Sequence, residues 1–359
     1  MRLTPDAFAK YSGGVRRSAL ELLGALREAG APVSVSTFIE RTTTQTSPTP
    51  SPLRRAFLQA AEAAYFARQR LHHQRGIAHS LYYDQQLRAA DWPLVVTVHD
   101  MIHERFGEGS TALRWAKRLA VHRAALIVTP SRATASDVTG FFPDVGSKVV
   151  TIPWGVSPVF LEDVPEGPQV EPDRPFLLYV GARSSYKNLI VLVRALESAS
   201  DLDEFRLVLA GGGPLLAGER HELTHALRDR ERLAHVTSPT DEALRDLYDR
   251  AAVSVVTSRC EGFGLPLLEA MARGCPVACA GGQAAAEVTG GYAATFSPDS
   301  AQECAAAIRL AFRSSRADRR SAREHARRFT WAVAAQSHID VYRSLEGADR
   351  RSGRVRKPR

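Results

Sequence analysis

Two carboxylates and the small residues between them are the most chemically suggestive feature of the sequence. Glu261 and Glu269 are separated by seven residues that include two glycines and a proline. The segment before them, 251–258, is apolar and β-branched, which is typical of a buried parallel strand. A helix is expected at 267–273, and N–H groups at a helix start lack intrahelical partners. This turn therefore suits a phosphate, with carboxylates placed for the hydroxyls of a sugar and a ribose.

The run 260–272 resembles the donor-site motif of retaining nucleotide-sugar glycosyltransferases of family 4, which have the GT-B fold. The resemblance implies that Glu261 meets the hydroxyls of the donor sugar and that Glu269 meets the ribose. It also implies that the backbone amides around Phe263, Gly264 and Leu265 meet the diphosphate. The alternative is an ordinary α/β crossover with a surface glutamate at each end.

A second charged element, 179–188, follows an apolar strand and contains Arg183 and Lys187. It resembles the second diphosphate element of the same family. A departing nucleoside diphosphate is strongly anionic, so two fixed cations would stabilise the transition state. Arg183 could contact a phosphate bidentately and Lys187 as a point charge, unless both are solvated loop residues. Asn188 is expected to cap the next helix.

In the first half, the apolar strand 95–98 is followed directly by polar residues, of which His99 and Asp100 are the first. It resembles the His-Asp element of mannosyl- and rhamnosyl-transferring members of the family. The resemblance implies that His99 bonds the donor sugar near the reacting carbon and that Asp100 lies close to the acceptor. His103 replaces the proline that is familiar in this element. A structural role for His99 is the alternative, and the match favours GDP-mannose as the donor.

Glycines near the N-terminus form another candidate loop. Gly13 and Gly14 permit close backbone approach, and they resemble the family's glycine loop beside the diphosphate and the acceptor. The adjacent Arg16 and Arg17 could meet an acidic acceptor or serve as ordinary charges at a helix start.

Three further turns complete the candidate site. The glycines of 211–214 are expected to form a turn that lines the cleft, although they lack the later glycine of a dinucleotide fingerprint. Thr237 and Ser238 end a strand, and by resemblance the backbone there contacts the base. Ser131 begins a capped helix and is a weak candidate for the cleft.

The alternation of strands and helices predicts an α/β protein with two doubly wound, Rossmann-like domains, whose ligands lie at the carboxyl ends of the strands. Strands are expected at 32–39, 94–99, 125–129, 148–152, 176–180, 206–210, 234–237, 254–257 and 276–280. The predicted parts are an acceptor-side domain (1–165), a proline-rich linker (161–175), a nucleotide-sugar domain (176–330), a helix that crosses back (331–346) and a tail (347–359).

The chain has 359 residues and a formal charge of +8. The tail 347–359 holds six basic residues and one acid, a net +5, and its composition predicts disorder. The tail could contact an anionic membrane or have no partner. The basic helix expected at 53–73 could lie on a membrane or pack on its own domain. Interleaved aromatics and recognition motifs for nucleic acid are absent from the sequence.

No apolar run reaches the length of a transmembrane helix, and the first residues lack a secretion signal. The expected location is cytoplasmic, with peripheral contact at the inner face of the membrane left open. Four cysteines without zinc-ligand spacing are expected to be reduced, and neither a metal nor a cofactor is expected beyond the donor.

The predicted function is hexose transfer, with mannose favoured, from a nucleoside diphosphate sugar to a glycan, lipid-linked or small-molecule acceptor. The resemblance favours front-face attack, although covalent catalysis by Glu261 stays open. The alternatives are a non-catalytic partner subunit with the same fold and a phosphorylase or epimerase. The incomplete glycine fingerprint disfavours an oxidoreductase.

Overall fold

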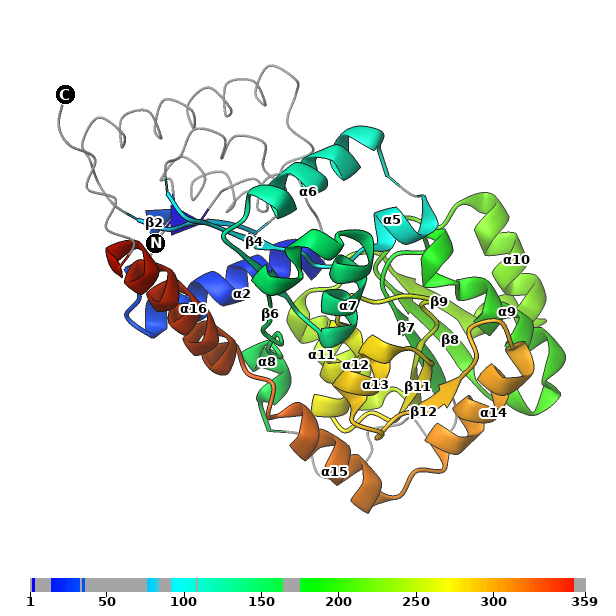
Figure 1. The fold of residues 1–359 in the computed structure, drawn as a ribbon. Helices are drawn as coiled ribbons and strands as arrows, with labels where there is room; N and C mark the ends of the chain where they lie inside the picture. The colour runs from blue at the N-terminus through cyan, green and yellow to red at the C-terminus, as the bar shows by residue number, and fades with distance from the viewer. Residues whose placement is uncertain are drawn as a thin grey trace. The chain divides into compact units, whose positions relative to one another are not determined.

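The computed structural model describes residues 2–3, 14–32, 34–35, 76–81, 83, 92–107, 109–163 and 175–351, with the backbone alone at 2–3, 34–35 and 347–351. The chain forms two compact units (Figure 1). Unit 1 consists of Met1–Gly155 and Trp331–Arg359, and unit 2 of Val156–Thr330. The expected helix 53–73 and most of the predicted linker and tail lie outside the described residues.

Unit 1 is built on a parallel sheet with the strand order β2-β1-β3-β4-β5-β6. Its strands are β1 (Arg2–Leu3), β2 (Ser34–Val35), β3 (Ala78–Ser80), β4 (Leu94–Thr97), β5 (Leu126–Thr129) and β6 (Val149–Thr151). Its helices are α2 (Gly14–Glu28), α5 (Ile102–Phe106), α6 (Thr111–Arg123), α7 (Arg132–Phe141) and α16 (Trp331–Arg351). Helix α6 lies on one face of the sheet, and α2 and α16 lie on the other (Figure 1).

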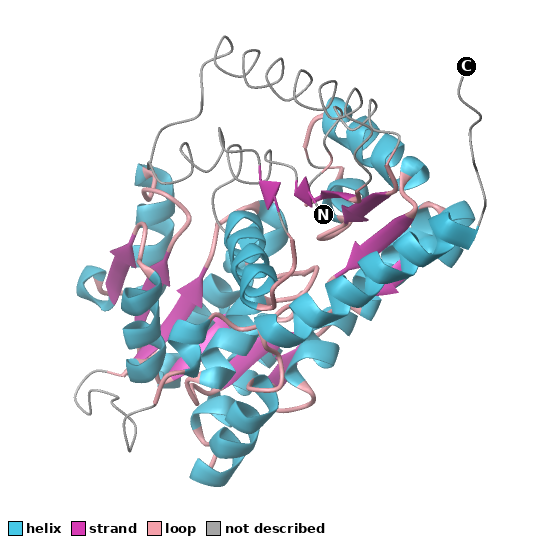
Figure 2. Cartoon of the chain, turned by 90° about the vertical axis from the view of Figure 1, so that its left-hand side faces the viewer, coloured by secondary structure: helices cyan, strands magenta, loops and turns pink. Residues whose placement is uncertain are grey.

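Unit 2 has a parallel sheet with the order β12-β11-β10-β7-β8-β9. Its strands are β7 (Phe176–Val180), β8 (Arg206–Ala210), β9 (Leu233–Val236), β10 (Val253–Val256), β11 (Val277–Ala280) and β12 (Ala294–Phe296). Helices flank the strands (Figure 2), and they are α8 (Pro158–Leu161), α9 (Leu189–Ser198), α10 (Ala217–Leu227), α11 (Asp241–Arg250), α12 (Leu265–Ala272), α13 (Gln283–Thr289), α14 (Ala301–Phe312) and α15 (Arg316–Ala326).

Two doubly wound parallel sheets confirm the predicted fold class. The predicted bounds of β7 and β8 are those of the structure, β9 and β10 begin and end one residue earlier than predicted, and β11 begins one residue later. The sequence analysis missed β1, β3 and β12. Each has only two or three residues, which is too short for a β-branched or alternating pattern to stand out.

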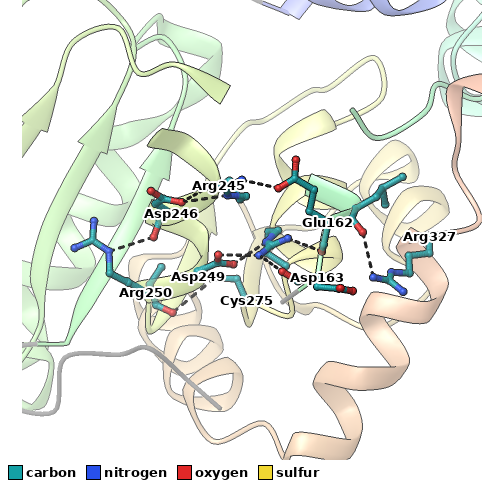
Figure 3. A network of polar contacts seen from close by, with 11 residues as sticks. Glu162, Asp163, Arg245, Asp246, Asp249, Arg250, Cys275 and Arg327 are labelled. Carbon is teal, nitrogen blue, oxygen red and sulfur yellow. Dashed lines mark hydrogen bonds and ion pairs between the residues drawn. The ribbon is translucent and has the colours of Figure 1, made fainter. Parts of the chain in front are cut away.

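The start of the predicted linker is a fixed part of unit 2, which corrects the expected end of the first domain at 165. Arg273 donates to the main-chain oxygens of Glu162, at 2.8 Å, and of Asp163. It is buried and pairs through two nitrogens with the carboxylate of Asp249. Arg245 reaches the Glu162 carboxylate at 2.7 Å (Figure 3). These arginines hold Glu162 and Asp163 in unit 2, and the first segment of unit 1 ends at Gly155.

Helix α16 packs in unit 1 against α2 and places its apolar side, including Trp331 and Tyr342, in the core of that unit. The Tyr342 hydroxyl lies 2.7 Å from Nδ1 of His79, whose Nε2 lies 2.8 Å from the Thr97 hydroxyl. His338 stacks on His79 with ring centroids 5.7 Å apart. Burial lowers the pKa of His338 to about 4. The helix is thus held by a buried polar cluster that depends on neutral histidines.

Candidate functional site

The carboxyl end of β10 brings together two of the predicted site residues. Lys187 Nζ lies 2.7 Å from Glu261 Oε1, with 16% and 14% of the two side chains exposed. The Thr257 hydroxyl donates to the Lys187 carbonyl, and the Arg259 amide donates to the Tyr186 carbonyl. These bonds join the loop after β7 to the loop after β10. The pairing of Lys187 with Glu261 therefore follows from the strand order.

The ammonium of Lys187 is held in its charged form. Burial opposes the charge, but the attraction of the Glu261 carboxylate outweighs burial and raises the pKa of Lys187 above its usual value. The ammonium also lies over an aromatic ring, 5.3 Å from the centroid of Tyr186. A partly exposed, permanently charged lysine at a strand end is suited to an anionic ligand.

Helix α12 begins at Leu265, two residues earlier than predicted, after Gly264 in the left-handed region at φ 102°. A Cβ at Gly264 would lie 2.9 Å from the Leu267 side chain, so glycine is required by both conformation and space. Phe263 is buried and meets the Phe329 ring edge to face. The phosphate-binding role of this helix start stays a prediction.

Glu269 lies inside α12 and is only 2% exposed. The hydroxyl of Tyr248, on α11, lies 3.2 Å from its Oε2. Tyr248 is itself fully buried and packs edge to face on Phe160 of α8. A tyrosine that the sequence analysis did not identify therefore holds the Glu269 carboxylate, which the resemblance assigns to the ribose.

Arg183 has a different environment from the one expected. Its guanidinium donates to the carbonyls of Gly211, Gly213 and Pro214 and lies 3.1 Å from the Glu219 carboxylate. Four of its five N–H groups are used in this way, so the predicted bidentate phosphate contact does not fit this arrangement. A Cβ at Gly212 would lie 2.5 Å from the Arg183 side chain. Arg183 thus clamps the glycine turn, and Lys187 is the more available cation.

The remaining candidates in unit 2 lie at turns. Thr237 and Ser238 are exposed just after β9, and Thr240 caps α11 through a bond from the Ala243 amide. Asn188 precedes α9 as predicted, but its side chain does not cap the helix. Its amide donates to the Pro298 carbonyl at 2.7 Å instead, and its backbone is left-handed at φ 53°. Their ligand contacts stay predictions.

In unit 1, His99 follows β4 and is buried, with its ring against Trp154. Its Nε2 lies 2.5 Å from the Leu81 carbonyl, which can only accept, so Nε2 carries the proton. Burial lowers the pKa of His99, against the opposing influence of that hydrogen bond and of Asp100. The ring is neutral at pH 7 and cannot supply positive charge to a leaving group.

A buried lysine, which the sequence analysis missed, supports the loop after His99. Lys117 of α6 is 0% exposed, and its Nζ lies 2.6 Å from Glu104 Oε2 and 3.1 Å from the Asp100 carbonyl. The ammonium also lies 5.0 Å from the centroid of the Tyr83 ring. Asp100 accepts a hydrogen bond from the Ile102 amide. Lys117 thereby fixes the backbone between β4 and α5.

The other unit 1 candidates are less informative. Gly14 begins α2, and a Cβ there would extend into open space. Gly13 lies outside the described residues. Ser131 is fully buried and caps α7 by accepting from the Thr134 amide, which confirms the predicted capped helix start. Among the described residues there is no group of three or more His, Cys, Asp or Glu side chains placed to hold a metal.

Two family models match the chain. Residues 12–160 match "Glycosyltransferase Family 4", and residues 162–329 match "Glycosyl transferases group 1". A curated relative, D-inositol 3-phosphate glycosyltransferase 2 from Catenulispora acidiphila, is 35% identical over 191 residues, which cover 49% of this chain and 44% of the relative. The chain spans about half the length of the first curated relatives it matches.

Solved structures show the same fold. Sucrose-phosphate synthase from Thermosynechococcus elongatus superposes with a TM-score of 0.76 at 21% identity, covering 97% of this chain and 99% of that one. The Anabaena protein HepE, solved in complex with UDP-glucose, gives a TM-score of 0.72 at 20% identity, with 96% and 99% covered. With one family model on each side of the boundary between the units, the chain belongs to the glycosyltransferases with the GT-B fold.

Proposed function

We propose that the protein transfers a hexose from a nucleoside diphosphate sugar to an acceptor with retention of configuration at the anomeric carbon. The observation that carries this proposal is the pair formed by Lys187 and Glu261 at the carboxyl end of β10. A cation and a carboxylate held together beside a helix start match the needs of an anionic leaving group and a polyhydroxylated sugar.

In the proposed reaction, the bond between the anomeric carbon and the diphosphate oxygen breaks while a bond to the acceptor oxygen forms on the same face. The electron pair of the broken bond stays on the diphosphate, and the acceptor proton moves to a leaving phosphate oxygen. Lys187 stabilises the charge that develops on the diphosphate. Glu261 accepts hydrogen bonds from the sugar hydroxyls. His99 bonds the donor sugar as a neutral imidazole.

In this proposal Arg183 is a positioning residue. Its guanidinium orders the glycine turn 211–214 after β8 and leaves phosphate contact mainly to Lys187 and to backbone amides. The Glu269 carboxylate binds the ribose, and the Tyr248 hydroxyl holds this carboxylate in place.

The donor and the acceptor are the finer parts of the proposal. Mannose is favoured by the His99–Asp100 element, whereas HepE was solved with UDP-glucose, so both GDP and UDP sugars need testing. The acceptor is a glycan, a lipid-linked sugar or a small molecule. The name of the Catenulispora relative adds a phosphorylated polyol to the acceptors worth testing.

The proposal is tested by thermal unfolding with GDP, UDP, ADP, dTDP and their sugars, without added metal. A ligand that binds only the folded state at one hundred times its Kd stabilises by about 2.7 kcal/mol. One diphosphate should raise the Tm selectively, and Lys187→Ala should reduce that shift while Lys148→Ala retains it. The absence of a shift with every nucleotide would contradict the donor site and favour the partner-subunit alternative.

A further inference from the structure

Helix α6 has an outer face unlike that of the other described helices of unit 1. Trp115 and Leu119 lie one turn apart on it and are 59% and 43% exposed. Large apolar side chains at i and i+4 form a continuous stripe on a helix. Burial of such a stripe against a partner is favourable, because its apolar surface is removed from water.

Arginines flank this stripe on both sides. With 3.6 residues per turn, Arg118 lies about 60° to one side of Trp115, and Arg123 lies about 40° beyond Leu119 on the other. Arg114 is one turn before Arg118 and extends the first flank. The helix contains no Asp or Glu in its sequence. Arg114 and Arg118 have no acidic partner within the described residues, so their charges face outward uncompensated.

The inner face of α6 has the opposite character. Its one lysine, Lys117, is buried and neutralised by Glu104 at 2.6 Å. At the end of the helix, Lys148 donates to the His122 carbonyl and adds another positive charge. The acidic contact there is that of Asp144 with His122. The outward field of this helix is therefore positive along its length.

We propose that this face, defined by Arg114, Trp115, Arg118, Leu119 and Arg123, docks on an anionic lipid surface. An indole ring has an apolar body and a polar N–H, which suits the boundary between headgroups and acyl chains. Arginine side chains can lie along such a boundary and donate to lipid phosphates. An amphipathic helix with Trp and Leu between basic residues is the arrangement that lies in a membrane interface.

Charge alone does not explain this choice of surface. Helix α15 carries Arg316, Arg319, Arg320 and Arg323, but its sequence has no large apolar residue. It can attract an anionic surface without inserting into it. Only α6 joins uncompensated arginines to an exposed indole among the helices that the structure describes, so it is assigned to lipid rather than to a soluble polyanion.

The same helix holds the loop after His99 through Lys117. Docking of α6 would therefore place the acceptor-side loop of unit 1 near the lipid headgroups. The link between docking and the acceptor rests on the proposed function, and it favours a lipid-linked acceptor. Vesicle binding is measured without a sugar nucleotide, so its outcome is independent of the donor site.

The experiment uses the full chain in flotation with phosphatidylcholine vesicles, with and without phosphatidylglycerol. The wild type should float only with anionic vesicles. Trp115→Ala with Leu119→Ala should lower the partition coefficient roughly tenfold or more, and Arg114→Gln with Arg118→Gln should lower it roughly thirtyfold. The matched control, Arg316→Gln with Arg320→Gln on α15, removes the same charge and should change binding far less.

Equal losses in the two arginine pairs would show binding governed by net charge and would overturn the proposal, as would unchanged flotation of the Trp115/Leu119 variant. A wild type that does not float at all would overturn it too. A drop in molecular mass of the Trp115/Leu119 variant in solution, without a change in flotation, would assign the face to self-association instead.

Tryptophan fluorescence gives a second, independent measurement. The chain has four tryptophans, and of those described Trp115 is the exposed one. Anionic vesicles should shift its emission to the blue and protect it from an aqueous quencher. The spectral change should vanish in Trp115→Phe, whereas a change that persists in this variant would contradict insertion of the indole.

Discussion

Each unit contains a lysine–glutamate pair beyond the carboxyl end of a parallel strand, but the two pairs differ in exposure. In unit 1, Lys117 and Glu104 meet at 2.6 Å with the lysine fully buried. In unit 2, Lys187 and Glu261 meet at 2.7 Å with both side chains partly exposed. The distances are almost equal, so geometry alone does not distinguish them.

The difference in exposure separates a structural pair from a pair that can exchange partners. Removing one member of a buried pair leaves an uncompensated charge, which costs about 3–5 kcal/mol. A partly exposed lysine can pass from a carboxylate to a phosphate at lower cost, because water screens the intermediate arrangement. We therefore assign Lys117 to the scaffold and Lys187 to the chemistry.

The largest expected effect is on the buried pair. Lys117→Met should lower the free energy of unfolding by about 3–5 kcal/mol, because Glu104 then stays buried without its cation. Chemical denaturation measures the loss, and Lys148→Met, at a partly exposed site, is the control. The double variant with Glu104→Leu should be more stable than Lys117→Met alone. A double variant that is weaker than the single one would contradict this account of the pair.

Acid should affect unit 1 through a second buried group. The folded-state pKa of His338 is about 4, below its usual value of 6.5, so the unfolded chain binds the proton first as the pH falls. Its contribution is complete above about pH 6.5, and about 3 kcal/mol is lost by pH 4. His338→Phe should flatten the dependence of unfolding free energy on pH in this range. Identical pH profiles for wild type and variant would exclude the effect, and exposed His225→Gln serves as the control.

The partly exposed pair should affect rate more than stability. Lys187→Ala should slow transfer roughly a hundredfold, about 2.7 kcal/mol, if its charge stabilises the departing diphosphate. The free energy of unfolding should change much less than in Lys117→Met. Single-turnover kinetics separate transfer from donor binding. An unaltered rate would remove Lys187 from the chemistry and, with it, the distinction between the two pairs.

The smallest expected effect is at the support beneath Glu269. Tyr248→Phe removes the hydroxyl that lies 3.2 Å from the carboxylate and should weaken donor binding roughly fivefold, about 1 kcal/mol. Titration calorimetry with the identified donor measures it, with exposed Tyr292→Phe as the control. Donor affinity that is unchanged in Tyr248→Phe but lost in Glu269→Ala would limit the tyrosine to packing.

Sequence predicted the central strands of unit 2 well because they are apolar and buried on both faces, as in Phe176–Val180. The short strands β1, β3 and β12 were missed because two or three residues are too few to show a period. The end of unit 1 was misplaced for a different reason. Prolines and acids after Leu161 predict a linker, but the arginines that hold Glu162 and Asp163 come from residues about eighty or more positions away.

The candidate site was predictable where one local motif carries it, as at Glu261 and Gly264. Contacts between distant elements were not predictable, because spacing along the chain says nothing about which loops meet. Glu219 lies 36 residues from Arg183, and its carboxylate turns a predicted phosphate ligand into a clamp. Lys117 looks like any basic residue of an amphipathic helix until Glu104 is placed beneath it.

The backbone bond from the Val156 amide to the Phe329 carbonyl, at 2.9 Å, and the bridge between Val156 and Thr330 bring the two ends of unit 2 together. Unit 2 is therefore one uninterrupted stretch of chain whose ends meet, inserted into unit 1. On the ribosome it can close as soon as residue 330 has emerged. Unit 1 must wait for α16, with the core positions of Trp331 and Tyr342 unfilled. Unit 1, whose first segment is made first, is then completed last. Until α16 is made, its apolar core stays exposed, and aggregation can compete with folding.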